Sequence, residues 1–120
     1  MSIETDFRAT LAAHAPLASL VGTRIALNAV PEGQATPLVV YACAHDRTLG
    51  LDNSLLADQC AIQVECWAAT AAQADEVADA VVAAVATAPA ASGACVLARA
   101  GTHDPELGLD GVTLTVEWWV

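Results

Sequence analysis

One stretch decides the fold, residues 59–85, and it reads QCAIQVECWAATAAQADEVADAVVAAV. Apolar side chains at the even positions from 60 to 66 alternate with more polar ones, and this period of two predicts a half-buried strand. A helix then runs from Thr70 to about Thr87, because the Thr70 hydroxyl can cap the first turn and Gln73 completes a capping-box pattern. The inward stripe of that helix consists of small apolar residues, Ala71, Ala74, Val77, Ala78, Val81 and Val85.

The flanking segments add one helix and four strands. Residues 3–20 have helical spacing, and Pro16 separates the main helix from a final turn that Gly22 ends. Further strands are predicted at residues 24–28, 38–43, 95–100 and 112–120, with a polar connection over 102–110. This order predicts a single α+β domain over residues 1–120. Its sheet has about five strands, mostly antiparallel, with two helices packed on one face.

Residues 45–57 combine turn residues with an unusual number of leucines. The segment reads HDRTLGLDNSLLA and contains Leu49, Leu51, Leu55 and Leu56. A solvated loop would rarely keep four leucines. We therefore expect this segment either to pack back on the domain or to dock on a neighbouring protein.

Composition excludes two broad classes of function. Four Arg and no Lys oppose 14 Asp and Glu residues, which gives a formal net charge of -10. Binding of DNA by a basic surface is not expected, because affinity for phosphates needs clustered cations. A membrane span is not expected, since no run of about 18 strongly apolar residues occurs.

The sequence contains no motif for catalysis, a cofactor or a metal. It lacks a nucleophile elbow, a phosphate-binding loop and the His or Cys spacing of a zinc site. His45 with Asp46, and His103 with Asp104, are at most partial ligand pairs. The four cysteines are expected to be small buried hydrophobes. We therefore predict a protein that is not an enzyme and has no cofactor.

The tryptophans indicate contacts on both sides of the sheet. Trp118 and Trp119 are adjacent in a predicted strand, so their side chains point to opposite faces. Trp67 lies on the polar face of its own strand. A tryptophan that points away from the core either covers the second face of its own sheet or serves in an interface, where this residue is enriched.

The order of elements and several short runs resemble the tail terminator, or tail completion, proteins of long-tailed phages and gene transfer agents. The resemblance spans about residues 3–120. It is carried by Leu20-Val21-Gly22, Arg24-Ile25, Pro37-Leu38-Val39-Val40-Tyr41, Ile62-Gln63-Val64-Glu65-Cys66-Trp67-Ala68, and the helix with Ala74, Val77, Ala78 and Val81. Leu38 departs from the aromatic residue usual after the proline, and Asp58 and Gln59 stand where a basic residue is common.

The resemblance implies a structural virion protein, assembled in the host cytoplasm and located in the tail or neck. Relatives form rings, usually hexamers, that cap the tail tube and join it to the head–tail connector. The implied partners are thus copies of the chain itself, the tail tube protein and the connector or stopper protein. DNA passes through an acidic channel without specific binding.

If the chain forms a ring, the unusual features of its sequence suggest which residues meet other subunits. The leucines of residues 45–57 are candidates for docking to the tube or to a neighbour, and Trp67 and Trp119 are candidate interface residues. Arg24, Arg47 and Arg99, scarce cations in an acidic chain, could pair with carboxylates on the next subunit. For each arginine the competing expectation is a pair within the chain or at its surface.

Three other functions remain open at this stage. The chain could be a head–tail connector or stopper protein of the neck, which the same sequence pattern fits. It could be a small cytosolic α+β ligand-binding domain or enzyme, which would need a pocket of converging polar groups. It could also be a dimeric interaction module.

Overall fold

The computed structural model describes residues 3–28, 35–52 and 55–119, without the side chains at 46–49, 55–58 and 91. Two helices begin the chain, α1 (Ile3–Ala13) and α2 (Ala15–Val21). The strands β1 (Ile25–Leu27), β2 (Leu38–Leu49) and β3 (Leu55–Ala68) follow, and then helix α3 (Ala71–Val85). A short 3₁₀ turn, η1 (Ala90–Ser92), leads to β4 (Cys95–Asp104) and β5 (Leu109–Trp119).

The five strands form one sheet in the order β1-β2-β3-β5-β4. β1 runs parallel to β2, and the other three neighbouring pairs are antiparallel. The predicted α+β class and the mostly antiparallel sheet are confirmed. β2 was predicted from its apolar run over 38–43, and it lies inside the sheet between β1 and β3, as such a run favours.

Three α-helices, rather than the predicted two, are present among the described residues. The expected final turn after Pro16 is a helix of its own, α2, with Pro16 in its first turn and His14 preceding it in an extended conformation. Proline lacks a backbone N–H and is tolerated only where a helix does not need one. Pro16 therefore ends the first helix and suits the start of the second.

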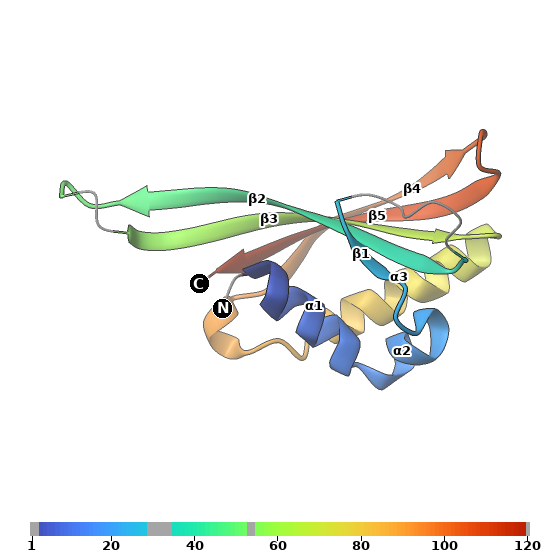
Figure 1. The fold of residues 1–120 in the computed structure, drawn as a ribbon, viewed down its shortest axis with the longest axis horizontal. Helices are drawn as coiled ribbons and strands as arrows, with labels where there is room; N and C mark the ends of the chain where they lie inside the picture. Colours follow the sequence, from blue (N-terminus) through green and yellow to red (C-terminus); the bar gives the residue numbers. More distant parts are fainter. Residues whose placement is uncertain (1–2, 29–34, 53–54, 120) are drawn as a thin grey trace.

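All three helices lie on one side of the sheet (Figure 1), and the core fills the space between. Phe7 of α1 anchors this packing. Its ring centroid is 5.8 Å from that of Trp118, edge to face, and 5.4 Å from that of Tyr41. Thr70 caps α3 as predicted, since its hydroxyl accepts a hydrogen bond from the Gln73 amide at 3.2 Å. None of the described helices is long and apolar enough to cross a membrane.

The β2–β3 hairpin projects from one end of the molecule (Figure 1). The predicted strands ended at residue 43 and began at residue 59, but the antiparallel ladder continues as far as Leu49 opposite Leu55. The segment at 45–57 is thus mostly strand. His45 at its start contacts Glu4 of α1, and the hairpin then extends away from the helices. This arm contributes to overall dimensions of 50 × 29 × 24 Å.

The β4–β5 hairpin is also longer than the sequence predicts. Most of the expected connection over 102–110 is strand, and only a tight turn remains between Asp104 and Leu109. The Asp104 carboxylate accepts hydrogen bonds from the backbone amides of Glu106 and Leu107, at 3.0 and 3.2 Å. Gly108 takes a positive φ of 64°, which a residue with a side chain rarely adopts.

Candidate assembly surfaces

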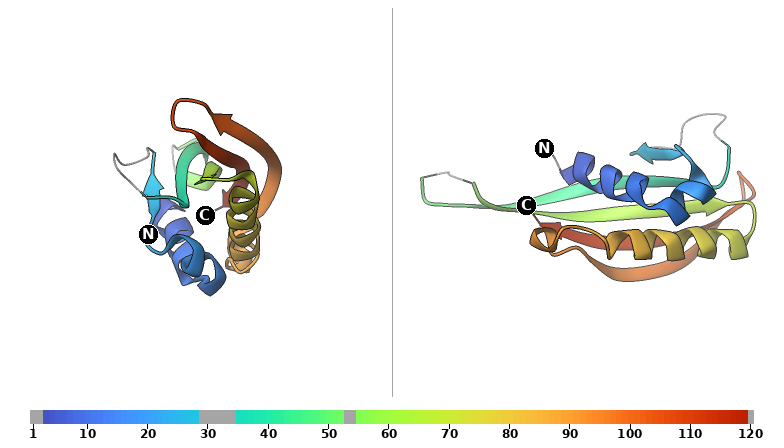
Figure 2. Two further views of the ribbon diagram at one scale, coloured as in Figure 1. Left: turned by 90° about the vertical axis from the view of Figure 1, so that its right-hand side faces the viewer. Right: turned by 90° about the horizontal axis from the view of Figure 1, so that it is seen from below.

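Among the described residues, no helix covers one face of the sheet, and we call the residues of this face on β3 and β5 the open face. The open face comprises Gln59, Ala61, Gln63, Glu65, Trp67, Thr113, Thr115 and Glu117, all of them partly or fully exposed. Figure 2 shows, in its end-on view, the sheet curling over the helices with this face outward. The open face is therefore a polar surface with two carboxylates.

Hydrogen bonds along the open face hold its side chains together. Gln59 Nε2 donates to Glu117 Oε1 at 2.6 Å, and Thr115 Oγ1 donates to Gln63 Oε1 at 3.0 Å. The Trp67 indole N–H donates to Glu65 Oε2 at 3.1 Å. In two of these bonds the donor to the carboxylate is a neutral amide or indole N–H group.

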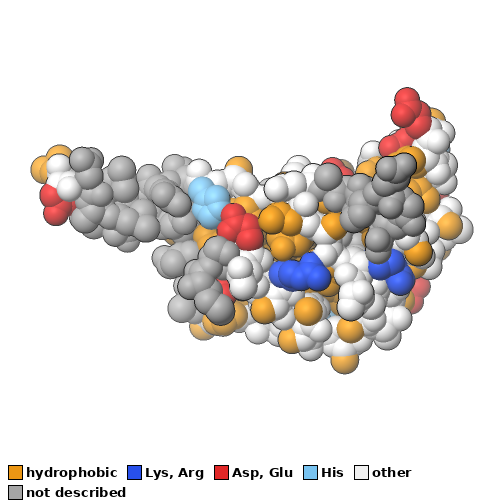
Figure 3. Space-filling view, in the orientation of Figure 1, with side chains coloured by type: hydrophobic (Ala, Val, Ile, Leu, Met, Phe, Trp, Pro, Cys, Tyr) orange, Lys and Arg blue, Asp and Glu red, His pale blue; other side chains and the backbone are white. Residues whose placement is uncertain are grey.

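The arginines with described side chains form their hydrogen bonds on the side of the molecule that carries the helices. Arg24 donates from Nε to the Pro37 carbonyl at 2.8 Å and from Nη2 to the Leu20 carbonyl at 3.2 Å. Arg8 donates to the Ile25 carbonyl. Arg8 and Arg24 thus fasten the segment that contains β1 to its surroundings. Figure 3 shows the basic side chains of the viewed face as two separate patches.

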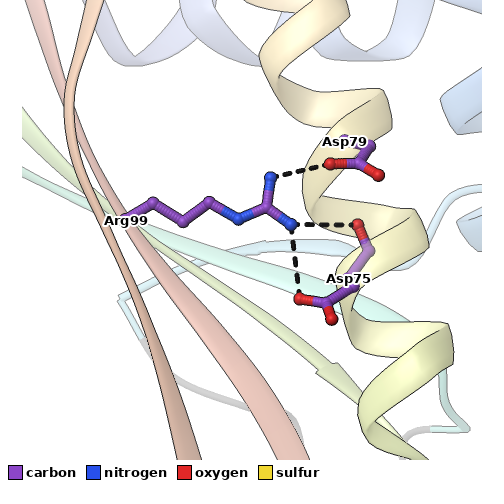
Figure 4. Close-up of polar contacts among 3 residues, drawn as sticks. All are labelled: Asp75, Asp79 and Arg99. Carbon is purple, nitrogen blue, oxygen red and sulfur yellow. Dashed lines mark hydrogen bonds and ion pairs between the residues drawn. The ribbon is translucent and has the colours of Figure 1, made fainter.

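Arg99 reaches from β4 to helix α3 (Figure 4). Its guanidinium contacts Asp79 Oδ1 at 2.7 Å and Asp75 Oδ1 at 3.3 Å. The hydrogen bonds that Arg99 donates to Asp79 and, to a smaller extent, to Asp75 raise the pKa of Arg99 above its ordinary value. Arg24 and Arg99 are thus engaged within their own chain, and their contact with a second subunit stays a prediction. The side chain of Arg47 lies outside the described residues.

The predicted leucines occupy the tip of the β2–β3 hairpin. Leu51 is fully exposed in the turn. Leu49, Leu55 and Leu56 lie at the paired ends of the two strands, and their side chains are outside the described residues. The structure therefore brings the four leucines to one end of the arm, while docking to another protein stays a prediction.

Trp118 and Trp119 point to opposite sides of β5, as predicted. Trp118 is 2% exposed in the core, whereas Trp119 is 39% exposed. Trp119 borders an open groove of about 380 Å³ at the end of the sheet. The described lining of this groove is Asp6, Ala9, Thr10, Pro89, Ser92, Trp118 and Trp119.

Sequence reasoning missed three exposed leucines on the rest of the surface. Leu27 is 45% exposed at the end of β1, Leu97 is 59% exposed on β4, and Leu107 is 60% exposed in the β4–β5 turn. Leu27 and Leu97 lie on the two opposite edges of the sheet. In the sequence, Leu27 and Leu97 look like any other leucine in a strand. Their exposure becomes apparent only from the order of the strands in the sheet.

The described residues contain no group of three or more His, Cys, Asp or Glu side chains that could hold a metal ion. His45 contacts Glu4 at 2.6 Å, and His103 contacts Asp110 at 2.9 Å. His103 thus pairs with an aspartate of the neighbouring strand, whereas the side chain of Asp46 lies outside the described residues. The His103 pair borders a shallow depression of about 430 Å³ whose described lining contains no cysteine.

None of the four cysteines forms a disulfide, and the exposure of one of them contradicts its predicted burial. Cys60 and Cys66 are buried and Cys43 is partly buried, but Cys95 is exposed because it begins β4 at the edge of the sheet. Burial raises the pKa of the Cys66 thiol to about 12. The pKa of Cys43 is also raised, by burial and by a hydrogen bond with Cys60. Cys43 and Cys66 are therefore poor nucleophiles.

Comparison with known proteins places the chain among the structural proteins of phage tails. The family model described as "Tail completion protein gp17" matches residues 5–120, and the chain belongs to this family. Its location is therefore the virion tail. A comparison with curated proteins found no match.

A solved structure described as "Virion of native gene transfer agent (GTA) particle" contains a chain with the same fold. The TM-score is 0.77 at 20% sequence identity, and the match covers 99% of this chain and 94% of that chain. The two chains therefore share the whole architecture.

Proposed function

We propose that the chain forms a hexameric ring that caps the tail tube and joins it to the head–tail connector, with DNA passing through the centre. Membership of the tail completion family supports a role at the end of a tail. The chain shares its fold with a chain of a gene transfer agent virion, which supports a role as one component of a larger particle. In this function the chain binds other proteins and performs no catalysis.

The observation that carries the proposal is the open face. It holds Glu65 and Glu117, while Arg8, Arg24 and Arg99 are all engaged elsewhere in the fold. A ring of six copies has a formal charge of about -60 from the sequence. A channel wall of this kind releases no counterions from DNA and repels its phosphates, so DNA slides past without being held.

The exposed apolar side chains supply the contacts of the ring. The hairpin tip with Leu51 extends beyond the body and can reach a tube subunit or a neighbouring copy. Trp67 on the open face and Trp119 beside its groove are further contacts of the same assembly. In a ring these contacts are heterologous, and closure sets the number of copies.

The position in the particle is tested by binding the purified chain to two kinds of assembly. Tail tubes and portal or adaptor rings from the same particle are each mixed with the chain, and the complexes are examined by electron microscopy and native mass spectrometry. We expect a ring at the end of the tubes and none on the portal rings. Binding to portal or adaptor rings alone would make the chain a stopper of the neck.

The acidic channel is tested by DNA binding as salt is varied. We expect the assembled ring to show no measurable affinity for duplex DNA at physiological salt. The double variant Glu65→Lys with Glu117→Lys should acquire salt-dependent binding if the open face lines the channel. The matched control for charge places two lysines at Ala72 and Ala83, which are exposed positions of α3. Tight DNA binding by the unmodified ring would contradict the proposal.

A further inference from the structure

A contact between Glu4 and His45 joins the base of the projecting hairpin to the first turn of α1. His45 Nε2 lies 2.6 Å from Glu4 Oε1, and the two side chains are 29% and 27% exposed. An ionised carboxylate can only accept hydrogen bonds, so the imidazole carries a proton on Nε2 and donates it. The pair is therefore a partly buried hydrogen bond between a helix and a strand that are distant in the sequence.

His45 lies where the sheet narrows to the arm. The β3–β5 ladder ends with Gln59 opposite Trp119, one position beyond the pair of His45 with Cys60. Past this point the described ladder is that of β2 with β3, which continues to the turn. The contact with α1 therefore acts where the arm begins to project. It fixes the direction of the arm relative to the helices, and this direction decides what the exposed Leu51 can reach.

The described ionisable groups that face this pair, from α1, β2 and β3, are Arg8, Tyr41, Cys43 and Cys60. Arg8 stays a cation throughout the physiological range. Burial raises the pKa of Tyr41 and that of Cys43, so both groups stay neutral at neutral pH. Cys60 is fully buried, which disfavours the charged form of a thiol. Within this described set, the His45 imidazole is therefore the group whose charge changes near neutral pH.

We propose that Glu4 and His45 form a pH-sensitive switch that holds the base of the arm to α1. When the imidazole is protonated, a cation donates to the Glu4 carboxylate, and such a charge-assisted hydrogen bond is stronger than a neutral one. Histidine loses this proton as the pH rises through about 6.5, which leaves a neutral donor and a weaker contact. The arm is therefore held more firmly at about pH 6 than at about pH 8. The switch belongs to the single chain and does not depend on the proposed ring.

Nuclear magnetic resonance of the isolated chain measures the switch without any substitution. The His45 imidazole and the backbone amides of Gly50 and Leu51 are followed from about pH 5 to about pH 8. We expect the amides of the turn to shift along the same curve as the imidazole, and residual dipolar couplings to report a change in the direction of the arm. The ratio of held to released arm should change by a factor of up to about five, as for partly exposed ion pairs. Turn amides that do not follow the imidazole would overturn the proposal.

Three variants assign the response to this pair. Glu4→Gln keeps an acceptor but removes the negative charge, so the imidazole should still titrate while the turn amides lose most of their response. His45→Gln keeps a donor that does not titrate, and the response should vanish. His103→Gln is the matched control, because its pair with Asp110 lies in the other hairpin, and it should leave the response unchanged. An undiminished response in Glu4→Gln or His45→Gln would overturn the switch, as would an equal loss in His103→Gln.

Discussion

At the scale of single residues, the contact between Trp67 and Gly111 explains how a tryptophan can lie on an otherwise polar face. The indole of Trp67 covers the backbone of the neighbouring strand, where Gly111 offers no side chain. A Cβ added at Gly111 would lie 2.8 Å from the ring. The glycine is therefore required by this close approach, and it lets Trp67 donate to Glu65 while part of its surface is shielded.

We predict that Gly111→Ala destabilises the fold by about 1–3 kcal/mol, because the rigid indole must move to make room. Urea unfolding, followed by tryptophan fluorescence, measures the loss of stability. The fluorescence of the folded variant also reports displacement of the Trp67 indole. Gly101→Ala is the matched control, since a methyl group there enters open space and should change stability little. Equal stability of the Gly111→Ala variant and the unmodified chain would contradict the role given to this contact.

At the scale of elements, the sequence predicted best where a single periodicity governs a segment. The alternation up to Trp67 and the small apolar stripe of α3 correctly indicated β3 and its following helix, because both elements pack against one core. The sequence also showed that Pro16 interrupts the N-terminal helix. It did not show that the residues after Pro16 form the separate helix α2, which packs against α3.

Strand lengths could not be read from the sequence, because ladder bonds use the backbone and not the side chains. His45 and Thr102 appear in polar segments that favour turns, yet both continue strands by pairing with a neighbour. The exposure of Leu27 and Leu97 depends on strand order, which a single sequence does not specify. Leu51 and Trp119 were named as candidates from side-chain type alone, and both are exposed, while their role in an interface stays a prediction.

The projecting hairpin leads to a prediction about Leu51. Because this side chain is fully exposed, Leu51→Ser should leave the melting temperature unchanged and weaken attachment to tail tubes. Co-sedimentation of the chain with tubes measures the attachment. Leu107→Ser, at the exposed turn of the other hairpin, is the matched control and should sediment with tubes normally. Equal sedimentation of the Leu51→Ser variant would remove the hairpin tip from the interface.

At the scale of the whole molecule, like charge opposes the meeting of identical subunits. Each copy has a formal charge of -10, so bringing copies together concentrates negative charge. Salt screens this repulsion, as the Debye length falls from about 30 Å at 0.01 M to about 8 Å at 0.15 M. We predict that rings form more readily on tubes at 0.15 M salt than at 0.01 M.

Light scattering or electron microscopy of tubes at the two salt concentrations measures this dependence. A chain in which Glu76 and Asp79 are both changed to their amides carries less charge and should need less salt. Asp79 also pairs with Arg99, so the single change Glu76→Gln separates the charge effect from loss of that contact. Assembly that declines as salt rises would show that attraction between opposite charges dominates the contacts.

The curl of the sheet in the end-on view of Figure 2 has a consequence for how assembly stops. In a ring built from identical curved subunits, every added subunit turns the assembly by the same angle, and growth stops when these turns add up to a full circle. The number of subunits in each ring is then set by the angle between neighbouring subunits and not by the amount of protein present. A host cell that makes more of this protein would obtain more finished rings, each of the same size.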